Sequence, residues 1–213
     1  MPPPPEHDSG VSRRSFLQTL GVSAAANSLA VAGAHAVELA EAAPTDDGPV
    51  LLGPEPARVV LRVNGKEQPV TIDPGTTLMD ALRLKLDLTG TKDICDRGSC
   101  GGCCVIMDGK LVNSCMTLAA DAIGADVRTI EGLADGERLH PLQQAFVKHD
   151  ALQCGYCTPG LVMACKAVLD KHPKPTLQQI KHGLAGNICR CGTYTNVFNA
   201  CLEASGQEPL IDK

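Results

Sequence analysis

Aromatic residues are scarce in this sequence: the 213 residues include two Tyr, three Phe and no Trp. A core built from this chain must therefore use mainly Leu, Val, Ile and Ala, which bury less area per residue than aromatic rings do. Clusters of basic residues are also missing, and the formal net charge is −5. Because nucleic-acid-binding proteins neutralise phosphates with clustered Lys and Arg, nucleic acid is not an expected partner.

Sequence motifs for nucleotide binding and for acid–base catalysis are missing as well. No Gly-x-Gly-x-x-Gly opens a predicted helix and no phosphate loop is present, so this chain is not expected to bind a flavin or a nucleotide. The six His residues are scattered and suggest no catalytic base; they are His7, His35, His140, His149, His172 and His182. If the protein takes part in catalysis, the reaction is expected to take place on a partner chain.

Cysteine, by contrast, is abundant, with eleven residues in the chain. This is about 5% of the sequence, too much for structural accident and too little for a small disulfide scaffold. The odd number also excludes complete disulfide pairing within the chain. Disulfides, zinc and iron–sulfur clusters all remain open on the count alone, and the spacing of the cysteines has to distinguish them.

Residues 1–36 are typical of a twin-arginine export signal. Arg13 and Arg14 stand in "SRRSFLQ", an uncharged run follows over residues 16–34, and "AHA" at 34–36 offers a small-x-small cleavage site. The run could instead be a transmembrane helix, but its Gly, Ser, Asn and Ala content is weak for stable spanning. We therefore expect export to the periplasm in the folded state, with no stable membrane span.

The rest of the chain divides into a linker and two halves of different character. Residues 37–57 are rich in Pro, Ala and acidic residues, which is typical of a linker. Residues 58–134 predict hairpins at Asn64-Gly65 and Asp108-Gly109, a helix capped by Thr76 or Thr77, and a closing strand at 126–130. Residues 135–206 change to helical periodicity and predict four helices. The predicted fold class is α+β, with a mixed half followed by an all-α half.

The first cysteine group has the spacing of a plant-type 2Fe-2S site. Cys95, Cys100 and Cys103 are spaced C-x4-C-x2-C, and Cys115 follows downstream. The surrounding glycines, Gly98, Gly101 and Gly102, let the backbone curl around an anionic cluster and point N–H groups at sulfur. Zinc fits less well, because structural zinc sites use paired knuckles or His ligands and no His lies between residues 95 and 115. Disulfides would leave the glycine content of the loop unexplained.

The second group consists of Cys154 and Cys157 in C-x2-C and Cys189 and Cys191 in C-x-C. Alone, either pair is compatible with zinc or with a redox dithiol, but together they form another set of four thiolates. The three remaining cysteines are expected to be buried and inert. Cys104 enters a strand, whereas Cys165 and Cys201 share helix faces with aliphatic residues.

Three motifs in order, "CDRGSCGGC…C", "QCGYCTPG" and "GNICRCGTY", resemble the small iron–sulfur subunit of the xanthine oxidase family of molybdenum hydroxylases. The resemblance covers about residues 58–205. It implies an N-terminal β-grasp, ferredoxin-like domain and a C-terminal four-helix bundle, each holding one 2Fe-2S cluster. With the export signal, the chain is most similar to the small subunit of periplasmic aldehyde oxidoreductases. The resemblance also implies that Gln153 and Cys191 lie near the pterin of a molybdenum cofactor.

The resemblance implies an electron-transfer role in a heterotrimer. A molybdenum-binding large subunit would oxidise an aldehyde to a carboxylic acid. Electrons would pass through the helical-domain cluster and then the ferredoxin-domain cluster to FAD on a medium subunit. The alternatives are a free-standing periplasmic carrier, a zinc-stabilised interaction protein, and a related hydroxylase acting on N-heterocycles or carbon monoxide. Cluster insertion before twin-arginine export would explain how so many thiols reach an oxidising compartment unpaired.

Overall fold

The computed structural model describes residues 52–210. The chain divides into two units, Met1–Gly48 and Pro49–Lys213, and the described residues all belong to the second. The twin-arginine segment expected at residues 1–36 lies outside the described residues, as does most of the linker expected at 37–57.

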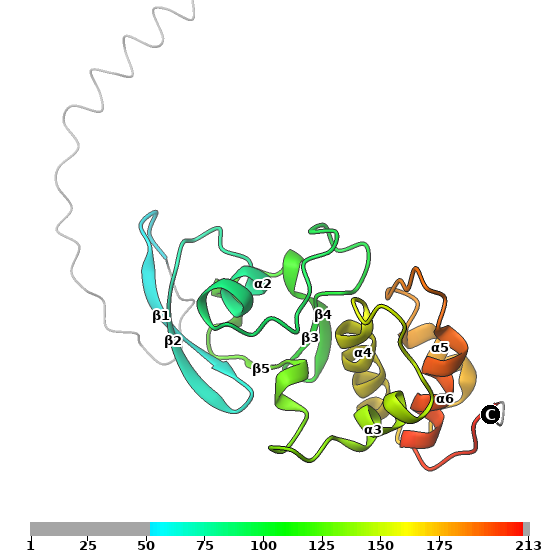
Figure 1. Ribbon diagram of the computed structural model, residues 1–213. Coiled ribbons are helices and arrows are strands. Elements are labelled where there is room, and N and C mark those ends of the chain that lie inside the picture. Colours follow the sequence, from blue (N-terminus) through cyan, green and yellow to red (C-terminus); the bar gives the residue numbers. More distant parts are fainter. Residues whose placement is uncertain (1–51, 211–213) are drawn as a thin grey trace, which may run out of the picture. The chain divides into compact units, whose positions relative to one another are not determined.

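The described part begins with a β-hairpin, as the sequence predicts (Figure 1). Strands β1 (Ala57–Val63) and β2 (Lys66–Ile72) pair antiparallel along their whole length. Asn64 and Gly65 join them with φ angles of 52° and 75°. Positive φ at both central residues of a two-residue turn defines the type I′ geometry that matches the strand twist. Alternate residues of β1, Val59, Leu61 and Val63, are buried, so one face of the hairpin forms part of a core.

Three further strands complete a five-stranded sheet in the order β2-β1-β5-β3-β4. The predicted second hairpin is β3 (Cys104–Met107) with β4 (Lys110–Asn113), paired antiparallel. The predicted closing strand is β5 (Asp126–Arg128), which lies in the middle of the sheet, parallel to β1 and antiparallel to β3. The sheet is therefore mixed, and its central strand, β5, is the last of the five in the sequence.

One helical segment covers a face of this sheet. The Thr77 side chain accepts a hydrogen bond from the Asp80 N–H at 3.1 Å and caps α2 (Leu78–Asp80). The segment continues as η1 (Ala81–Lys85), which has π-helical rather than α-helical geometry, with the Leu86 N–H donating to the Ala81 carbonyl at 3.1 Å. The predicted helix is thus confirmed in extent but changes type after its first turn. A helix packed across a mixed sheet of this order is the β-grasp arrangement.

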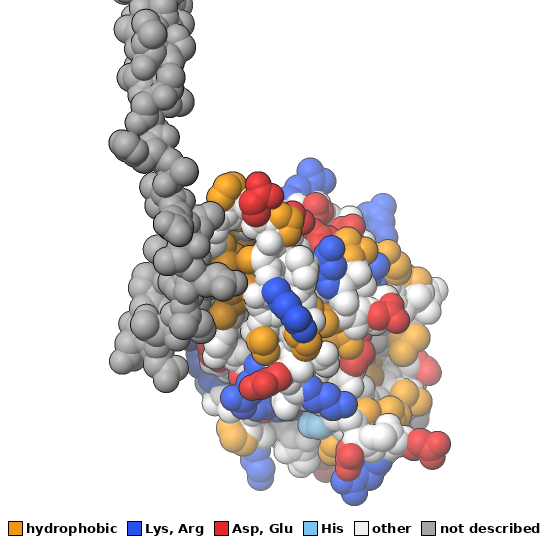
Figure 2. All heavy atoms as spheres, turned by 90° about the vertical axis from the view of Figure 1, so that its left-hand side faces the viewer, with side chains coloured by type: hydrophobic (Ala, Val, Ile, Leu, Met, Phe, Trp, Pro, Cys, Tyr) orange, Lys and Arg blue, Asp and Glu red, His pale blue; other side chains and the backbone are white. Residues whose placement is uncertain are grey.

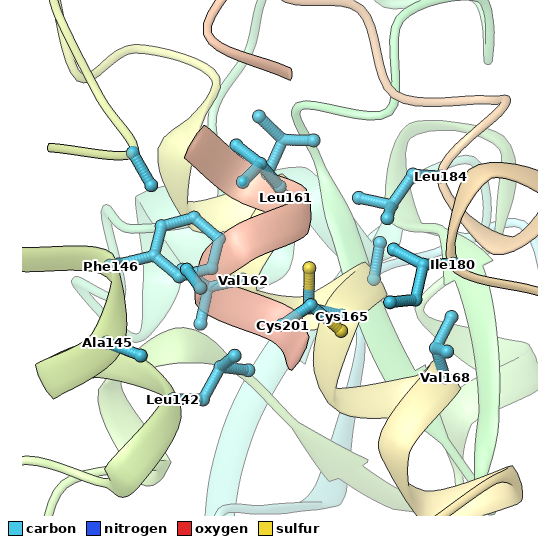
Figure 3. Packing of buried hydrophobic residues seen from close by; sticks show 14 of the residues in the cluster. Leu142, Ala145, Phe146, Leu161, Val162, Cys165, Val168, Ile180, Leu184 and Cys201 are labelled. Atoms are coloured by element: carbon cyan, nitrogen blue, oxygen red, sulfur yellow. The ribbon is translucent and has the colours of Figure 1, made fainter. Parts of the chain in front are cut away.

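The second half of the described chain is helical, as predicted. Its elements are α3 (Pro141–Lys148), α4 (Thr158–Lys171), α5 (Leu177–Gly183) and α6 (Tyr194–Ala204). Their apolar faces form one core, in which Cys165 and Cys201 are fully buried beside Leu161 and Ile180 (Figure 3). The prediction that these two cysteines are core residues is confirmed.

Helix α4 is the element that joins the two halves. It packs against α3, α5 and α6 on the helical side and against β3 and β4 on the sheet side. Contact is closest at Gly160, where an added Cβ would lie 2.2 Å from the Gly101 carbonyl oxygen and 3.0 Å from the Gly102 Cα. Only a residue without a side chain fits here, so Gly160 holds the start of α4 against the loop that carries Cys100 and Cys103.

The surface is mixed in charge on the side shown in Figure 2, where Lys and Arg side chains alternate with Asp and Glu over the described residues. Among residues 52–210, no helix is both long and apolar enough to cross a lipid bilayer.

The contact at Gly160 generates a stability prediction. Gly160→Ala should lower the free energy of unfolding by about 2 kcal/mol, because the new methyl group meets backbone atoms that have no rotamer to change. Chemical denaturation followed by circular dichroism measures this. Gly186→Ala is the control, because nothing lies within 4 Å of a Cβ added there. Since Ala is ordinarily the better helix former, a Gly160→Ala protein as stable as the parent would contradict the close contact.

Candidate metal centres

Four thiols gather where the loop after η1 meets the start of β3. Cys95 and Cys100 lie on this loop and are partly exposed, whereas Cys103 immediately precedes β3 and is buried. Cys115 lies in η2 (Ser114–Met116), the short 3₁₀ helix that follows β4, and is also buried. Met79 of α2 packs with Cys103 and Cys115 in a small buried cluster, which keeps water from that side of the group.

These thiols meet as two pairs. Cys95 lies within hydrogen-bonding reach of Cys100, and Cys115 lies within reach of Cys103. The pairs also interact electrostatically with each other, Cys95 with Cys115 and Cys100 with Cys103. A 2Fe-2S cluster takes two thiolates on each iron, so two adjacent pairs are the arrangement that it requires.

Backbone N–H groups of the loop point at the sulfur atoms. The Gly98 N–H donates to Cys115 Sγ at 3.3 Å, and the Gly102 N–H donates to Cys100 Sγ at 3.5 Å. The backbone N–H of Arg97, with the Cys100 thiol, lowers the pKa of Cys95 to about 7. Burial raises the pKa of Cys115 to about 12, despite the Gly98 N–H. The loop therefore stabilises negative charge on the Cys95 sulfur, whereas burial disfavours it on the Cys115 sulfur.

A second group of four thiols lies in the helical half. Cys154 and Cys157 stand on the segment before α4, with Cys157 at the N-terminal end of that helix. Cys189 and Cys191 lie on the segment between α5 and α6. They again form two pairs, Cys154 with Cys191 and Cys157 with Cys189. Cys154 and Cys191 are exposed, whereas Cys189 is buried.

Two residues that follow Cys191 make hydrogen bonds with Cys189. Its Sγ lies 3.3 Å from the Thr193 hydroxyl, and its N–H donates to the Tyr194 hydroxyl at 2.8 Å. Burial acts to raise the pKa of Cys189, but hydrogen bonds from Thr193, Cys157 and Gly192 outweigh it and lower that pKa to about 7. Burial raises the pKa of its neighbour Cys157 to about 12. In this pair one sulfur is readily a thiolate, and its partner resists ionisation.

The two groups share a requirement for positive charge. Adjacent thiolates repel each other, so two pairs of them need a cation to be ionised together. Within residues 52–210, no three Cys, His, Asp or Glu side chains converge as ligands of a single metal ion. An all-sulfur donor set arranged in pairs fits a two-iron, two-sulfide cluster at each group.

The other residues singled out from the sequence lie as follows. Gln153 is exposed on the segment before α4, directly beside Cys154. Cys104 is buried as expected, and burial raises the pKa of its thiol to about 11. It is not isolated, however, because its thiol donates to Asn113 Oδ1 at 3.4 Å and accepts from Asn187 Nδ2 at 3.7 Å. Sequence reasoning missed both asparagines, because each would ordinarily be taken for a turn or surface residue.

A β-grasp domain and a helical domain, each with four paired thiols, define the class of protein: an iron–sulfur protein with two 2Fe-2S-type centres. Comparison with known domain families agrees. Residues 61–129 match the family described as "2Fe-2S iron-sulfur cluster binding domain", and residues 129–202 match "[2Fe-2S] binding domain".

Similar proteins identify the family. The chain is 41% identical to the aldehyde oxidoreductase iron-sulfur-binding subunit PaoA of Escherichia coli O157:H7, over 94% of this chain and 91% of that protein. It is 46% identical to the nicotine 6-hydroxylase small subunit of Paenarthrobacter nicotinovorans, over 69% of this chain and 88% of that protein. The quinoline 2-oxidoreductase structure from Pseudomonas putida 86 superposes with a TM-score of 0.68 at 39% identity, covering 70% of this chain and 93% of that one. The chain belongs to the iron–sulfur electron-transfer subunits of the xanthine oxidase family of molybdenum hydroxylases.

The paired thiols predict the effect of removing one of them. Cys191→Ser should lower the iron content to about half that of the parent chain, because it removes one thiolate from the helical group and none from the other. Iron analysis and the visible absorption spectrum measure this. The control is Cys201→Ala, which removes a sulfur from the helical core and should leave the iron content unchanged. An unchanged iron content in Cys191→Ser would contradict the assignment of that thiol.

Proposed function

We propose that this chain binds two 2Fe-2S clusters and serves as the iron–sulfur subunit of an exported, molybdenum- and FAD-dependent aldehyde oxidoreductase. The proposed ligands of the first cluster are Cys95, Cys100, Cys103 and Cys115. Those of the second are Cys154, Cys157, Cys189 and Cys191. The observation that carries the proposal is that both sets form two facing pairs on two different domains.

A bound 2Fe-2S cluster would accept and release one electron at a time. The contribution of the chain is to hold and tune such a group. The N–H groups of Gly98 and Gly102 and the Thr193 hydroxyl face the thiols and would stabilise their negative charge, which raises a reduction potential. Met79 shields the buried pair of the first site from solvent.

Exposed apolar side chains beside both sites support the proposal that partner subunits bind there. Met116, next to Cys115, is 67% exposed, and Ile94, next to Cys95, is also exposed. Ile188, next to Cys189, is 55% exposed, and Tyr156 is exposed beside Cys157. Large apolar side chains left in solvent are typical of interaction surfaces. We propose that a FAD-binding medium subunit covers the first site and a molybdenum-binding large subunit covers the second, in a heterotrimer.

At the second site, the exposed positions of Gln153, Cys154 and Cys191 suit a contact across a subunit boundary. We propose that Gln153 and Cys191 approach the pterin of the molybdenum cofactor there. The free-standing carrier remains the alternative if no partner accompanies the chain.

The extent of the sequence matches favours an aldehyde as substrate. The match with the aldehyde oxidoreductase subunit covers 94% of this chain, whereas that with the nicotine hydroxylase subunit covers 69%. The first match therefore reaches beyond the two cluster domains. An N-heterocycle is the second candidate, because two of the relatives are named for nicotine and quinoline. Selectivity between these classes would reside in the pocket of the large subunit.

The test is to purify the tagged chain gently from the periplasmic fraction and to assay it for iron, molybdenum and flavin. All three should elute together, and the complex should reduce a dye with aldehydes faster than with nicotine or quinoline. Iron without molybdenum or flavin, under conditions that preserve complexes, would favour the free-standing carrier. A preparation with zinc and no iron would contradict the proposal as a whole.

The proposed export has its own test. Arg13→Lys with Arg14→Lys should keep the chain in the cytoplasm, because the twin-arginine route recognises the arginine pair. Fractionation and immunoblotting measure the distribution. The matched control is Arg58→Lys with Arg62→Lys, which makes the same substitutions outside the signal. Continued export of the Arg13, Arg14 variant would point to a different signal.

A further inference from the structure

The two thiol groups are connected by a direct hydrogen bond between their loops. The Ile188 N–H donates to the Cys100 carbonyl oxygen at 2.9 Å. Cys100 is a proposed ligand of the first cluster, and Ile188 immediately precedes Cys189, a proposed ligand of the second. A path from one sulfur to the other therefore runs along covalent bonds interrupted by a single hydrogen bond.

The neighbouring residue, Asn187, ties the same two loops together through its side chain. It is 4% exposed, and its Nδ2 donates to the Gly101 carbonyl at 2.9 Å. The same nitrogen lies 3.7 Å from the Cys104 Sγ. A buried amide is costly unless it is hydrogen-bonded, and this one makes its contacts with the loop of the other domain.

The backbone of Asn187 is fixed as well. Its N–H donates to the Leu184 carbonyl at 2.9 Å, and its carbonyl accepts from the Tyr194 hydroxyl at 3.2 Å. The Tyr194 hydroxyl also accepts from the Cys189 N–H. Asn187 therefore joins two rigid sets of contacts, one around Cys189 and one around Cys100.

Gly101 allows this approach. Its φ is +71°, a conformation that favours glycine, and an added Cβ would lie 2.5 Å from Asn187 Nδ2. Cys104 extends the chain of contacts in the other direction, donating to Asn113, whose Nδ2 donates to the Gly98 carbonyl at 3.3 Å. A continuous chain of hydrogen bonds therefore runs from the helical domain into the first thiol loop, through Asn187, Cys104 and Asn113.

We propose that Asn187 is a positioning residue for electron exchange between the two clusters: its side-chain amide holds the Gly101 carbonyl and so keeps the Ile188–Cys100 hydrogen bond in place. Asn187 touches no proposed metal and acts through the two loops that it joins. This inference rests on the proposed function, since it requires both thiol groups to hold clusters.

The experiment compares the full-length parent chain, with whatever subunits accompany it, with Asn187→Ala and Asn187→Asp. Alanine removes the donor, and aspartate keeps the shape but places an acceptor opposite the Gly101 carbonyl. The matched control is Asn199→Ala. Asn199 lies on α6, is similarly buried at 5% exposed, and accepts from the Leu210 N–H at 2.9 Å. Iron content and the separate paramagnetic resonance signals of the clusters are recorded first.

The deciding readout is the rate at which one electron, supplied by a one-electron photoreductant, redistributes between the two clusters. In both Asn187 variants this rate should fall about tenfold, the scale expected when a small displacement breaks an aligned contact. The magnetic interaction between the two reduced clusters should weaken in parallel. Iron content and the individual signals should stay as in the parent, and Asn199→Ala should match the parent throughout.

Two results would overturn the inference. One is an unchanged exchange rate in iron-loaded Asn187→Ala and Asn187→Asp. The other is loss of iron from both variants, which would make Asn187 a residue required for folding or cluster assembly rather than for exchange. Absence of iron from the parent chain would instead refute the proposed function, so the two failures are distinguishable.

Discussion

Most of the structure depends on one electrostatic constraint. The protein is small, yet it holds two groups of four sulfur atoms, and the sulfur atoms of each group lie close together although all of them can carry negative charge. Without a cation, the thiols of a pair cannot readily ionise together. Burial adds to this constraint at Cys157, whose pKa it raises to about 12, whereas hydrogen bonds lower the pKa of Cys189 to about 7. The chain meets the constraint mainly with loops, whose irregular backbone turns N–H groups toward sulfur, as at Gly98 and Gly102 of the first group. The sheet and the helices then serve to fix the ends of those loops.

The same constraint explains why the two halves are joined so tightly. Helix α4 begins at the second thiol group and packs on β3, which begins at the first. The contact between Gly160 and the Gly101 carbonyl brings the two backbones nearer than any side chain would allow. Separate modules on a flexible tether could each bind a cluster, but neither would have a fixed distance to the other. Here the distance is set by backbone packing, which is the least adaptable contact in a protein.

The sequence predicted the local structure well where a few adjacent residues decide it. Asn64-Gly65 specified a hairpin turn, Thr76 or Thr77 a helix start, which the structure places at Thr77, and the aliphatic faces around Cys165 and Cys201 specified core helices. The π-helical turn of η1 was not predictable, because such turns are rare and local propensity does not distinguish them from an α-helix. Cysteine spacing indicated both sets of thiols, but it could not show how they pair. The role of Asn187 was beyond reach, since its partner Gly101 lies 86 residues away and its local sequence suggests only a turn.

The exposure of the thiols supports the proposed relay over a simple carrier. A carrier that meets its partners one after another needs one accessible site, and a single ferredoxin-like domain would provide it. Here each group has a more open pair, Cys95 with Cys100 in one and Cys154 with Cys191 in the other, and a more enclosed pair. The two loops meet where the Ile188 N–H reaches the Cys100 carbonyl, and apolar side chains stand in solvent beside both openings. Two separate openings joined through a rigid interior suit a subunit held between two partners, because electrons can then enter at one site and leave at the other without either partner dissociating.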